Sequence, residues 1–201
     1  MTPSYNHKYI WTISLVAAMG GLLFGYDWVV IGGAKPFYVA YFGLATADKA
    51  WLAGWAMSSA LAGCLLGALL SGAITDRIGR KKVLVVAALL FTVSAIWTAL
   101  SGSFNPFILA RILGGIGIGL ASNVSPMYIA EVSPSGMRGK FVSLNQLTIV
   151  IGVLAAQLVN LLIYNSRPVA TDASVEVILN SWNGQYGWRW MFAAETVPDG
   201  F

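Results

Sequence analysis

The chain consists of long apolar stretches separated by short polar connections. Five stretches are long enough to cross a bilayer, which takes about 20 apolar residues in an α-helix. A sixth begins at Trp188 and reaches Phe201, the last residue, before it is long enough for a comfortable crossing. The predicted spans are residues 9–33, 50–74, 83–101, 104–130, 141–164 and, incompletely, 188–201. This pattern predicts an all-α, polytopic membrane bundle.

The composition supports this fold class. Of the 201 residues, 57% are hydrophobic and 10% are charged, whereas a typical soluble domain carries about 25% charged residues. The net charge of +4 does not indicate nucleic-acid binding, because no basic run is interleaved with side chains that read bases. We therefore expect the lipid bilayer, and no nucleic acid, as a partner of the chain.

Positive residues are distributed unevenly along the chain. They are densest in the short connection after the second span, in the sequence Arg77-Ile-Gly-Arg80-Lys81-Lys82. Short loops that carry many positive charges stay in the cytoplasm. The pattern predicts a multi-pass protein of the plasma (inner) membrane with a cytoplasmic amino terminus, and it places the polar segment 165–187 outside.

Glycines interrupt the first and fourth spans, which correspond to each other when the chain is divided into two sets of three spans. Such interruptions are typical of transporter repeats with a site at their interface. They also favour close helix packing, as in Gly63-x-x-x-Gly67 and Gly115-x-x-x-Gly119. The two interpretations are compatible.

Two ionisable residues lie within the apolar stretches, Asp27 in the first span and Arg111 in the fourth. Each is about six residues, or roughly 9 Å, from the predicted outer end of its helix. A carboxylate and a guanidinium at one depth can pair, which removes most of the cost of burial. The pair is either a permanent structural contact or a proton site, in which separation from Arg111 favours protonation of Asp27.

One face of the fifth span carries amide side chains, in the series Gln146, Val150, Val153 and Gln157. Asn160 is expected near the same face. Amides donate and accept hydrogen bonds, which suits a hydroxyl-rich solute such as a sugar. They serve equally well as contacts between membrane helices. Phe24, one turn before Asp27, is a candidate for contact with a solute or for packing alone.

Charges of both signs lie in the connections on the predicted inner side. They can hold helix ends together, or they can act as orientation signals only. These residues are Asp76, Arg77, Arg80, Glu131 and Arg138.

The sequence shows no chemistry of a cofactor-dependent protein. It contains no Gly-Lys-Ser/Thr loop for ATP and no spacing of metal ligands, and its single histidine is His7. No nucleophile with an adjacent base is visible. We therefore expect no cofactor, no metal and no enzyme activity.

Several ordered motifs together resemble the sugar porter family of the major facilitator superfamily. The resemblance extends over the whole chain. The motifs are GGLLFGYD, GAITDRIGRKK, RILGGIGIGLAS, SPMYIAEVSPSGMRG, NQLTIVIG and GWRWMF.

This resemblance implies the amino-terminal six-helix half of a major facilitator fold, cut within its last helix. It implies that a monosaccharide, a hexose or a pentose, binds between two halves, so that the expected partner is the carboxyl-terminal half or a second copy. Sugar:proton symport by alternating access is the expected function. A facilitative uniporter, or an inactive half with a structural role, is the alternative.

Roles of individual residues also follow from the resemblance. Asp27 is implied as the proton site with Arg111 as its partner, and Phe24 and Gln146 as sugar contacts. Val153 stands where a second glutamine is typical, and Gln157 is expected to compensate for it. Trp28 replaces a smaller residue that is typical after the aspartate, a change expected to narrow or re-line the nearby cavity. The charged residues of the inner side are implied as a salt-bridge latch of the outward-facing state.

Overall fold

The structure is a computed structural model that describes residues 7–170 and 173–196. These residues are mostly helical and contain no strand, which confirms the predicted all-α fold class. Within the described residues, five helices are long and apolar enough to cross a membrane. The elements are α1 (His7–Tyr41), the 3-10 turn η1 (Ala47–Lys49), α2 (Ala50–Ile78), α3 (Arg80–Leu100), α4 (Phe104–Val132), α5 (Arg138–Ser166), α6 (Val175–Asn180), the π-helical turn η2 (Asn183–Gly187) and α7 (Trp188–Ala193).

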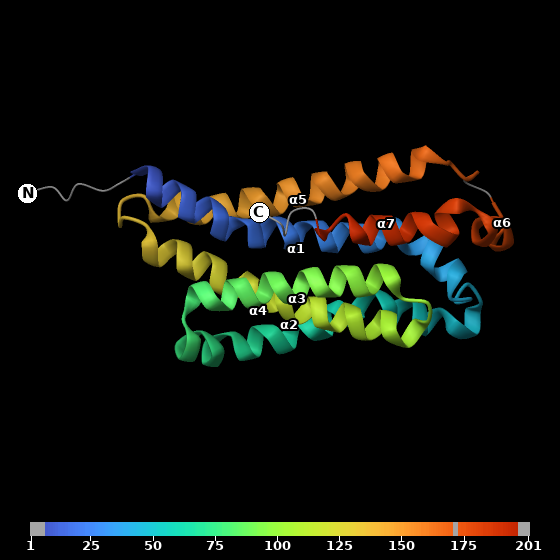
Figure 1. The fold of residues 1–201 in the computed structure, drawn as a ribbon, viewed down its shortest axis with the longest axis horizontal. Coiled ribbons are helices and arrows are strands. Elements are labelled where there is room, and N and C mark those ends of the chain that lie inside the picture. Colours follow the sequence, from blue (N-terminus) through green and yellow to red (C-terminus); the bar gives the residue numbers. More distant parts are fainter. Residues whose placement is uncertain (1–6, 171–172, 197–201) are drawn as a thin grey trace, which may run out of the picture.

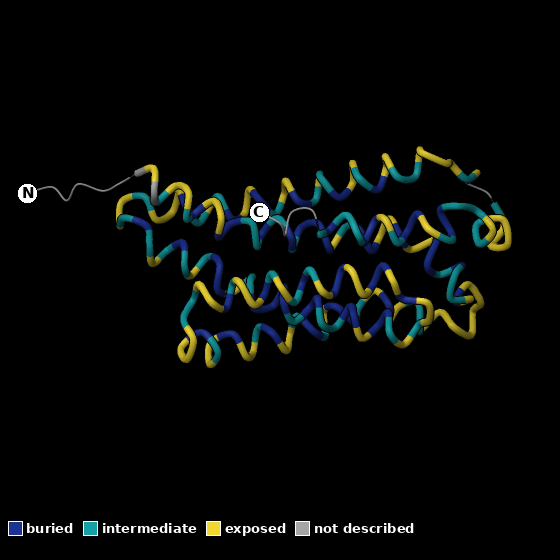
Figure 2. Tube along the Cα trace, viewed as in Figure 1, coloured by how far each residue is buried: buried dark blue, intermediate teal, exposed yellow. Residues whose placement is uncertain are grey.

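The helices pack in two groups. Figure 1 shows α1, α5 and α7 along one side of the molecule and α2, α3 and α4 along the other. The most extensive packing joins α1 to α5 and α4 to both α2 and α3, while contacts of α1 with α4 and of α3 with α7 connect the two groups. Buried positions lie between the helices, and many outward-facing positions are exposed (Figure 2). The exposed large hydrophobic residues of α2, α3 and α5 are mostly Leu, Val and Ile, as expected of helices that contact lipid or another membrane domain.

Glycines bring the paired helices into backbone contact. A Cβ atom at Gly63 would overlap the carbonyl oxygen of Ile112, and one at Gly115 would overlap that of Ala60. Gly25 of α1 faces the carbonyl of Ile149 in α5 in the same way. The small-residue spacings of the sequence therefore mark contact lines between helices.

Two long helices extend beyond their predicted ends. α1 continues past residue 33 to Tyr41, and α2 continues past residue 74 to Ile78. In α1, Pro36 cannot donate to the carbonyl of Gly32. The helix nevertheless continues because Phe37 and Tyr38 are buried in the apolar core, and their burial outweighs one lost hydrogen bond.

The segment predicted as a polar loop, residues 165–187, contains helical structure. It includes α6 and η2, and α7 begins at Trp188, the predicted start of the sixth span. Trp188 and Phe192 are fully buried and pack against the ring of Phe107. Ring contacts thus join α7 to Phe107 of α4 and Tyr41 of α1, and α7 packs most extensively on α3. Residues 197–201 of the predicted span lie outside the described residues.

We predict that Gly63→Ala destabilises the bundle, because the methyl group requires α2 and α4 to move apart. The expected loss is about 1–3 kcal/mol, measured as a lower midpoint of thermal unfolding in detergent. Gly54→Ala on the same helix is the control, since nothing lies within 4 Å of a Cβ atom at Gly54. Equal midpoints for the two variants would contradict backbone contact at Gly63.

Candidate functional site

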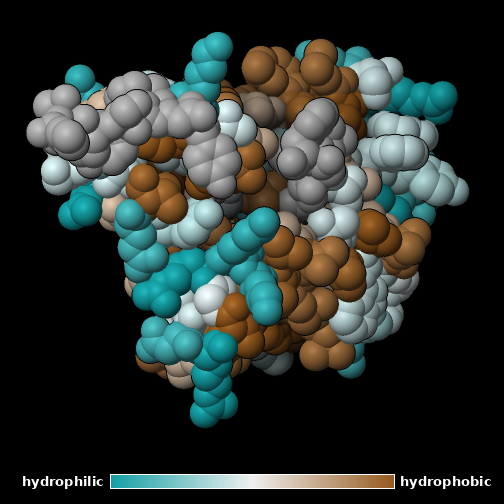
Figure 3. Space-filling model, turned by 60° about the vertical axis from the view of Figure 1, so that its left-hand side comes forward, coloured by the Kyte–Doolittle hydropathy of each residue, from teal (hydrophilic) through white to brown (hydrophobic). Residues whose placement is uncertain are grey.

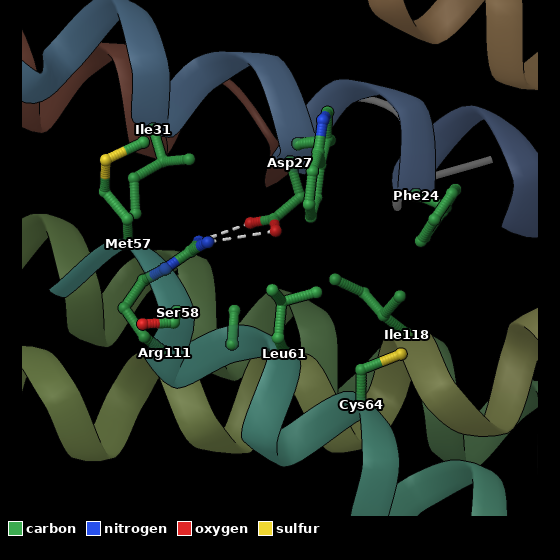
Figure 4. A pocket seen from close by; sticks show the side chains of 11 residues that line it. Phe24, Asp27, Ile31, Met57, Ser58, Leu61, Cys64, Arg111 and Ile118 are labelled. Atoms are coloured by element: carbon green, nitrogen blue, oxygen red, sulfur yellow. Dashed lines mark hydrogen bonds and ion pairs between the residues drawn. The ribbon is translucent and has the colours of Figure 1, made fainter. Parts of the chain in front are cut away.

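Asp27 of α1 and Arg111 of α4 form a bidentate ion pair (Figure 4). Arg111 Nη2 donates to Asp27 Oδ2 at 3.0 Å, and Nη1 donates to Oδ1. The side chains of Asp27 and Arg111 are 6% and 4% exposed. The pairing predicted from their equal depth is therefore present, and its two parallel hydrogen bonds are the geometry in which buried opposite charges stabilise each other.

Local packing explains how two charged side chains reach this position. Arg111 is followed by Gly114 and Gly115, which lie against α3 and α2, so that α4 is enclosed by its neighbours. Gly21 and Gly25 place α1 directly against α5. With these faces used for packing, the side chains of Asp27 and Arg111 meet in the space between the two groups of helices.

The surroundings of Arg111 include α7, which the sequence prediction did not include. The Cζ atom of Arg111 lies 5.3 Å from the centre of the Phe192 ring. Glu195 is 2% exposed and interacts electrostatically with Arg111. The signal in the sequence was an acidic residue within an apolar stretch, which is the criterion that identified Asp27. The guanidinium thus lies in the field of two acids, Asp27 of α1 and Glu195 in the turn that follows α7.

A cavity of about 290 Å³ lies beside the ion pair. α1, α2 and α4 contribute its walls, and Figure 4 shows the lining side chains around a shared space, with only Arg111 reaching Asp27. Apart from the ion pair, its walls are mostly apolar, with Phe24, Ile31 and Leu61 among the lining residues. Phe24 is thus the predicted sugar contact that the structure places next to Asp27.

The two predicted glutamines lie elsewhere. Gln146 and Gln157 are exposed on α5 and do not line the cavity beside Asp27. Asn160 does not share their face, because it is buried and a Cβ atom at Gly33 of α1 would overlap its side-chain amide. The amide-bearing face of α5 is uncovered by the described part of the chain, whereas the opposite face packs on α1.

A polar network that the sequence analysis missed connects α1, α4 and α5. The hydroxyl of Ser125 donates to the carbonyl of Ala17 and lies 3.1 Å from Asn145 Oδ1. Thr148 Oγ1 donates to the carbonyl of Ala18 at 2.6 Å. These contacts satisfy buried polar groups, and those of Ser125 join α4 to α1 and α5 away from the ion pair.

Three of the five predicted latch residues meet. Arg80 Nε donates to Glu131 Oε1 at 3.1 Å, and Arg80 Nη1 lies 3.7 Å from Asp76 Oδ1. Arg77 and Arg138 are exposed, and neither forms an ion pair within residues 7–170 and 173–196. Hydrophilic side chains gather at this end of the molecule, beside apolar flanks (Figure 3).

Long apolar helices with a buried acid–arginine pair beside a cavity are the arrangement of a secondary transporter. The chain belongs to the family of sugar (and other) transporters, whose model matches residues 13–201. This membership confirms the resemblance to sugar porters and places the chain among transporters and not among enzymes. Together with its membrane-length helices, it identifies a multi-pass inner-membrane protein.

Individual relatives are similar over nearly the whole chain. Identity is 41% to the D-xylose-proton symporter of Escherichia coli K12, over 98% of this chain and 43% of that protein. It is 39% to the arabinose-proton symporter of Bacillus subtilis, over 98% of this chain and 39% of that protein. Identity to the glucose transport protein of Synechocystis sp. PCC 6803 is 44%, over 96% of this chain and 39% of that protein. The chain thus spans less than half the length of these curated relatives.

Solved structures show the same fold. The proton:xylose symporter XylE bound to 6-bromo-6-deoxy-D-glucose matches with a TM-score of 0.85 and 39% identity, over 97% of this chain and 43% of that chain. The inward open conformation of the xylose transporter XylE from E. coli matches with a TM-score of 0.81 and 39% identity, over 95% of this chain and 46% of that chain. The helices described here therefore correspond to the first part of a major facilitator fold.

We predict that Arg111→Met destabilises the bundle more than the double variant Asp27→Leu/Arg111→Met. The single variant leaves a buried carboxylate without its guanidinium, a loss of about 3–5 kcal/mol. The double variant removes both charges and their desolvation cost. Thermal unfolding of the detergent-solubilised chain measures the difference at neutral pH. A double variant as unstable as the single one would show that the electrostatic pairing contributes little to stability.

Proposed function

We propose that this chain is the amino-terminal half of a sugar:proton symporter that works by alternating access. The buried Asp27–Arg111 pair supports the proton-coupling role, because it borders a cavity from which a proton can reach the carboxylate. The names of the symporters in E. coli and B. subtilis support a sugar as the substrate. The carboxyl-terminal half, or a second copy, completes the transporter.

In this proposal, the proton acts by neutralising Asp27. Protonation removes the Coulomb attraction to Arg111 and one of the acceptors of its hydrogen bonds. Arg111 then keeps its contact with Phe192 and its electrostatic interaction with Glu195. The conformation in which the ion pair joins α1 to α4 is then less stable relative to a conformation in which the two side chains are separated. Protonation therefore shifts the balance between conformations of the transporter.

The sugar contacts divide into two sets. Phe24 lies on the cavity wall, whereas Gln146 and Gln157 lie on the open face of α5. We assign the glutamines to a monosaccharide, a hexose or a pentose, that is enclosed when the other half of the transporter covers this face. Amides supply the donors and acceptors that sugar hydroxyls need.

The charged end of the bundle is assigned to the inner side, with the amino terminus in the cytoplasm. Its excess of Lys and Arg supports this orientation. There, Arg80 with Asp76 and Glu131 joins the α2–α3 turn to the end of α4. We assign Arg77 and Arg138 to the same latch on the family resemblance, as residues that pair in a conformation other than the present one.

The proton-coupling role predicts the behaviour of Asp27→Asn. The test uses a hybrid transporter in which these 201 residues replace the matching part of the E. coli D-xylose-proton symporter, reconstituted in lipid vesicles. Sugar uptake by the unmodified hybrid should make the external solution more alkaline. Asp27→Asn cannot release or take up a proton, so sugar-dependent alkalinisation should fall below about one tenth, and a pH gradient should no longer drive accumulation.

Asp48→Asn is the matched control, because Asp48 is an exposed acid in the turn before α2. It should leave proton movement unchanged. Proton movement that is equal in Asp27→Asn and the unmodified hybrid would exclude the proposed coupling role. Saturable sugar exchange without any proton movement in the unmodified hybrid would identify a uniporter, and no sugar movement at all would indicate a structural role.

The latch assignment predicts a difference between two neighbouring arginines. Arg80→Gln removes the contacts to Asp76 and Glu131, so it should favour opening of the inner side. The measurement is the labelling rate of a cysteine placed on the inner-side lining of the hybrid in a Cys64→Ala background, and the rate should rise several-fold. Arg77→Gln removes no ion pair of this conformation and should change the rate less. A larger rise in the labelling rate for Arg77→Gln than for Arg80→Gln would contradict the latch assignment.

A further inference from the structure

Four residues on one face of α1 line the cavity beside the ion pair: Phe24, Asp27, Trp28 and Ile31. Their spacing of three, four and seven residues from Phe24 returns to the same side of a helix. Two of the four are aromatic and stand one turn apart. The cavity therefore has an aromatic wall on α1. Trp28 is the next residue in the sequence after Asp27, the proposed proton site.

The surroundings of Trp28 distinguish it from a tryptophan at a lipid interface. Its side chain is 57% exposed, although it lines the same cavity as the nearly buried Asp27. Trp51, near the start of α2, is 69% exposed and does not line the cavity. The high exposure of Trp51 is typical of a residue that anchors a helix at the bilayer surface. Trp28, in contrast, lines the cavity that contains the Asp27–Arg111 pair.

We propose that Trp28 forms, with Phe24, the aromatic wall of a monosaccharide subsite directly beside the Asp27–Arg111 pair. The proposal rests on the proposed sugar transport and assigns to Trp28 a part in sugar recognition. The cavity volume of about 290 Å³ is at the lower end of ligand sites, which commonly measure about 300–1,000 Å³. This size suits one sugar ring and not an oligosaccharide.

The chemistry of the walls suits a pyranose. The faces of Phe24 and Trp28 provide an apolar surface for the C–H groups of the ring, and the indole N–H donates to a hydroxyl. On α2, the Ser58 hydroxyl donates to the carbonyl of Gly54 at 2.7 Å, so its oxygen can still accept from a sugar hydroxyl. Arg111 Nη1 and Nη2 are bonded to Asp27, whereas the buried Arg111 Nε has no hydrogen-bond partner among the described residues. The other lining residues are mostly apolar, so recognition depends largely on the aromatic surface.

Occupancy of this subsite also affects the ion pair. A sugar ring in the cavity displaces water from beside Asp27 and Arg111, which lowers the local dielectric and alters the balance between paired and separated charges. Sugar affinity and the protonation of Asp27 are then coupled, and the coupling acts equally in both directions. Trp28 is adjacent to Asp27, so it connects sugar occupancy to the proton site.

The first test compares sugar exchange by the hybrid transporter carrying Trp28→Ala, Trp28→Phe or Trp51→Ala. Exchange is measured at equal pH on both sides of the vesicle, so that proton coupling does not enter. Trp28→Ala, which removes the aromatic ring, should raise KM about three- to tenfold, the range expected for an aromatic contact, with kcat nearly unchanged. Trp28→Phe should recover most of the affinity, and Trp51→Ala should match the unmodified hybrid.

The second test is tryptophan fluorescence during titration with D-xylose and D-glucose. The unmodified hybrid and Trp51→Phe should show a saturable sugar-dependent change, which Trp28→Phe should largely lose. Because Trp28→Phe keeps an aromatic ring, it separates loss of the indole signal from misfolding. This measurement does not require transport.

The outcomes separate the two proposals. An unchanged KM in Trp28→Ala, or a full fluorescence response in Trp28→Phe, would overturn the subsite. If the Trp28 variants behave as expected but the unmodified hybrid moves no protons, the symport proposal fails and the subsite stands. If Trp28→Ala and Trp51→Ala lower thermal stability equally and leave KM unchanged, Trp28 is a membrane anchor and the subsite is excluded.

Discussion

The cost of placing a charge in hydrocarbon determines how this bundle is organised. Asp27 is stable inside because Arg111 meets it with two parallel hydrogen bonds, and that geometry requires α1 and α4 to face each other at one depth. The glycine contacts of α1 with α5 and of α4 with α2 leave these two faces free for each other. Close packing and charge pairing are therefore parts of the same arrangement, since neither side chain could be enclosed if the helices stood further apart.

The same constraint gives the ion pair its proposed functional value. A pair that holds the two groups of helices together only while Asp27 is ionised makes their association sensitive to a proton. The cavity beside the pair provides access to the carboxylate, and Phe24 and Trp28 line the same cavity. At the charged end, the contact between Arg80 and Glu131 is partly exposed to solvent, where ion pairs contribute little stability and exchange readily. A buried contact that responds to protons and an exposed contact that opens easily are suited to different steps of alternating access.

Several features were predictable because they depend on local patterns. Hydropathy predicted the spans, and the equal depth of Asp27 and Arg111 predicted their pairing. The first span was predicted to end at residue 33, whereas α1 continues to Tyr41. The burial of Phe37 and Tyr38 that supports the extra turns depends on residues far along the chain. The helical structure in 165–187 and the place of Glu195 near Arg111 depend on tertiary packing in the same way. Gln146 and Asn160 are similar in the sequence, but only the packing of α5 on α1 shows that they lie on different faces.

The central claim is that Asp27 is the group that binds the transported proton. Infrared difference spectroscopy of the hybrid transporter, recorded with and without sugar across a pH titration, observes carboxyl protonation directly. The account predicts a band from a protonated carboxylic acid in a dry environment that responds to sugar, is present in Asp48→Asn and is lost in Asp27→Asn. A sugar-sensitive carboxyl band that persists in Asp27→Asn would assign the proton to another acid and would contradict the account.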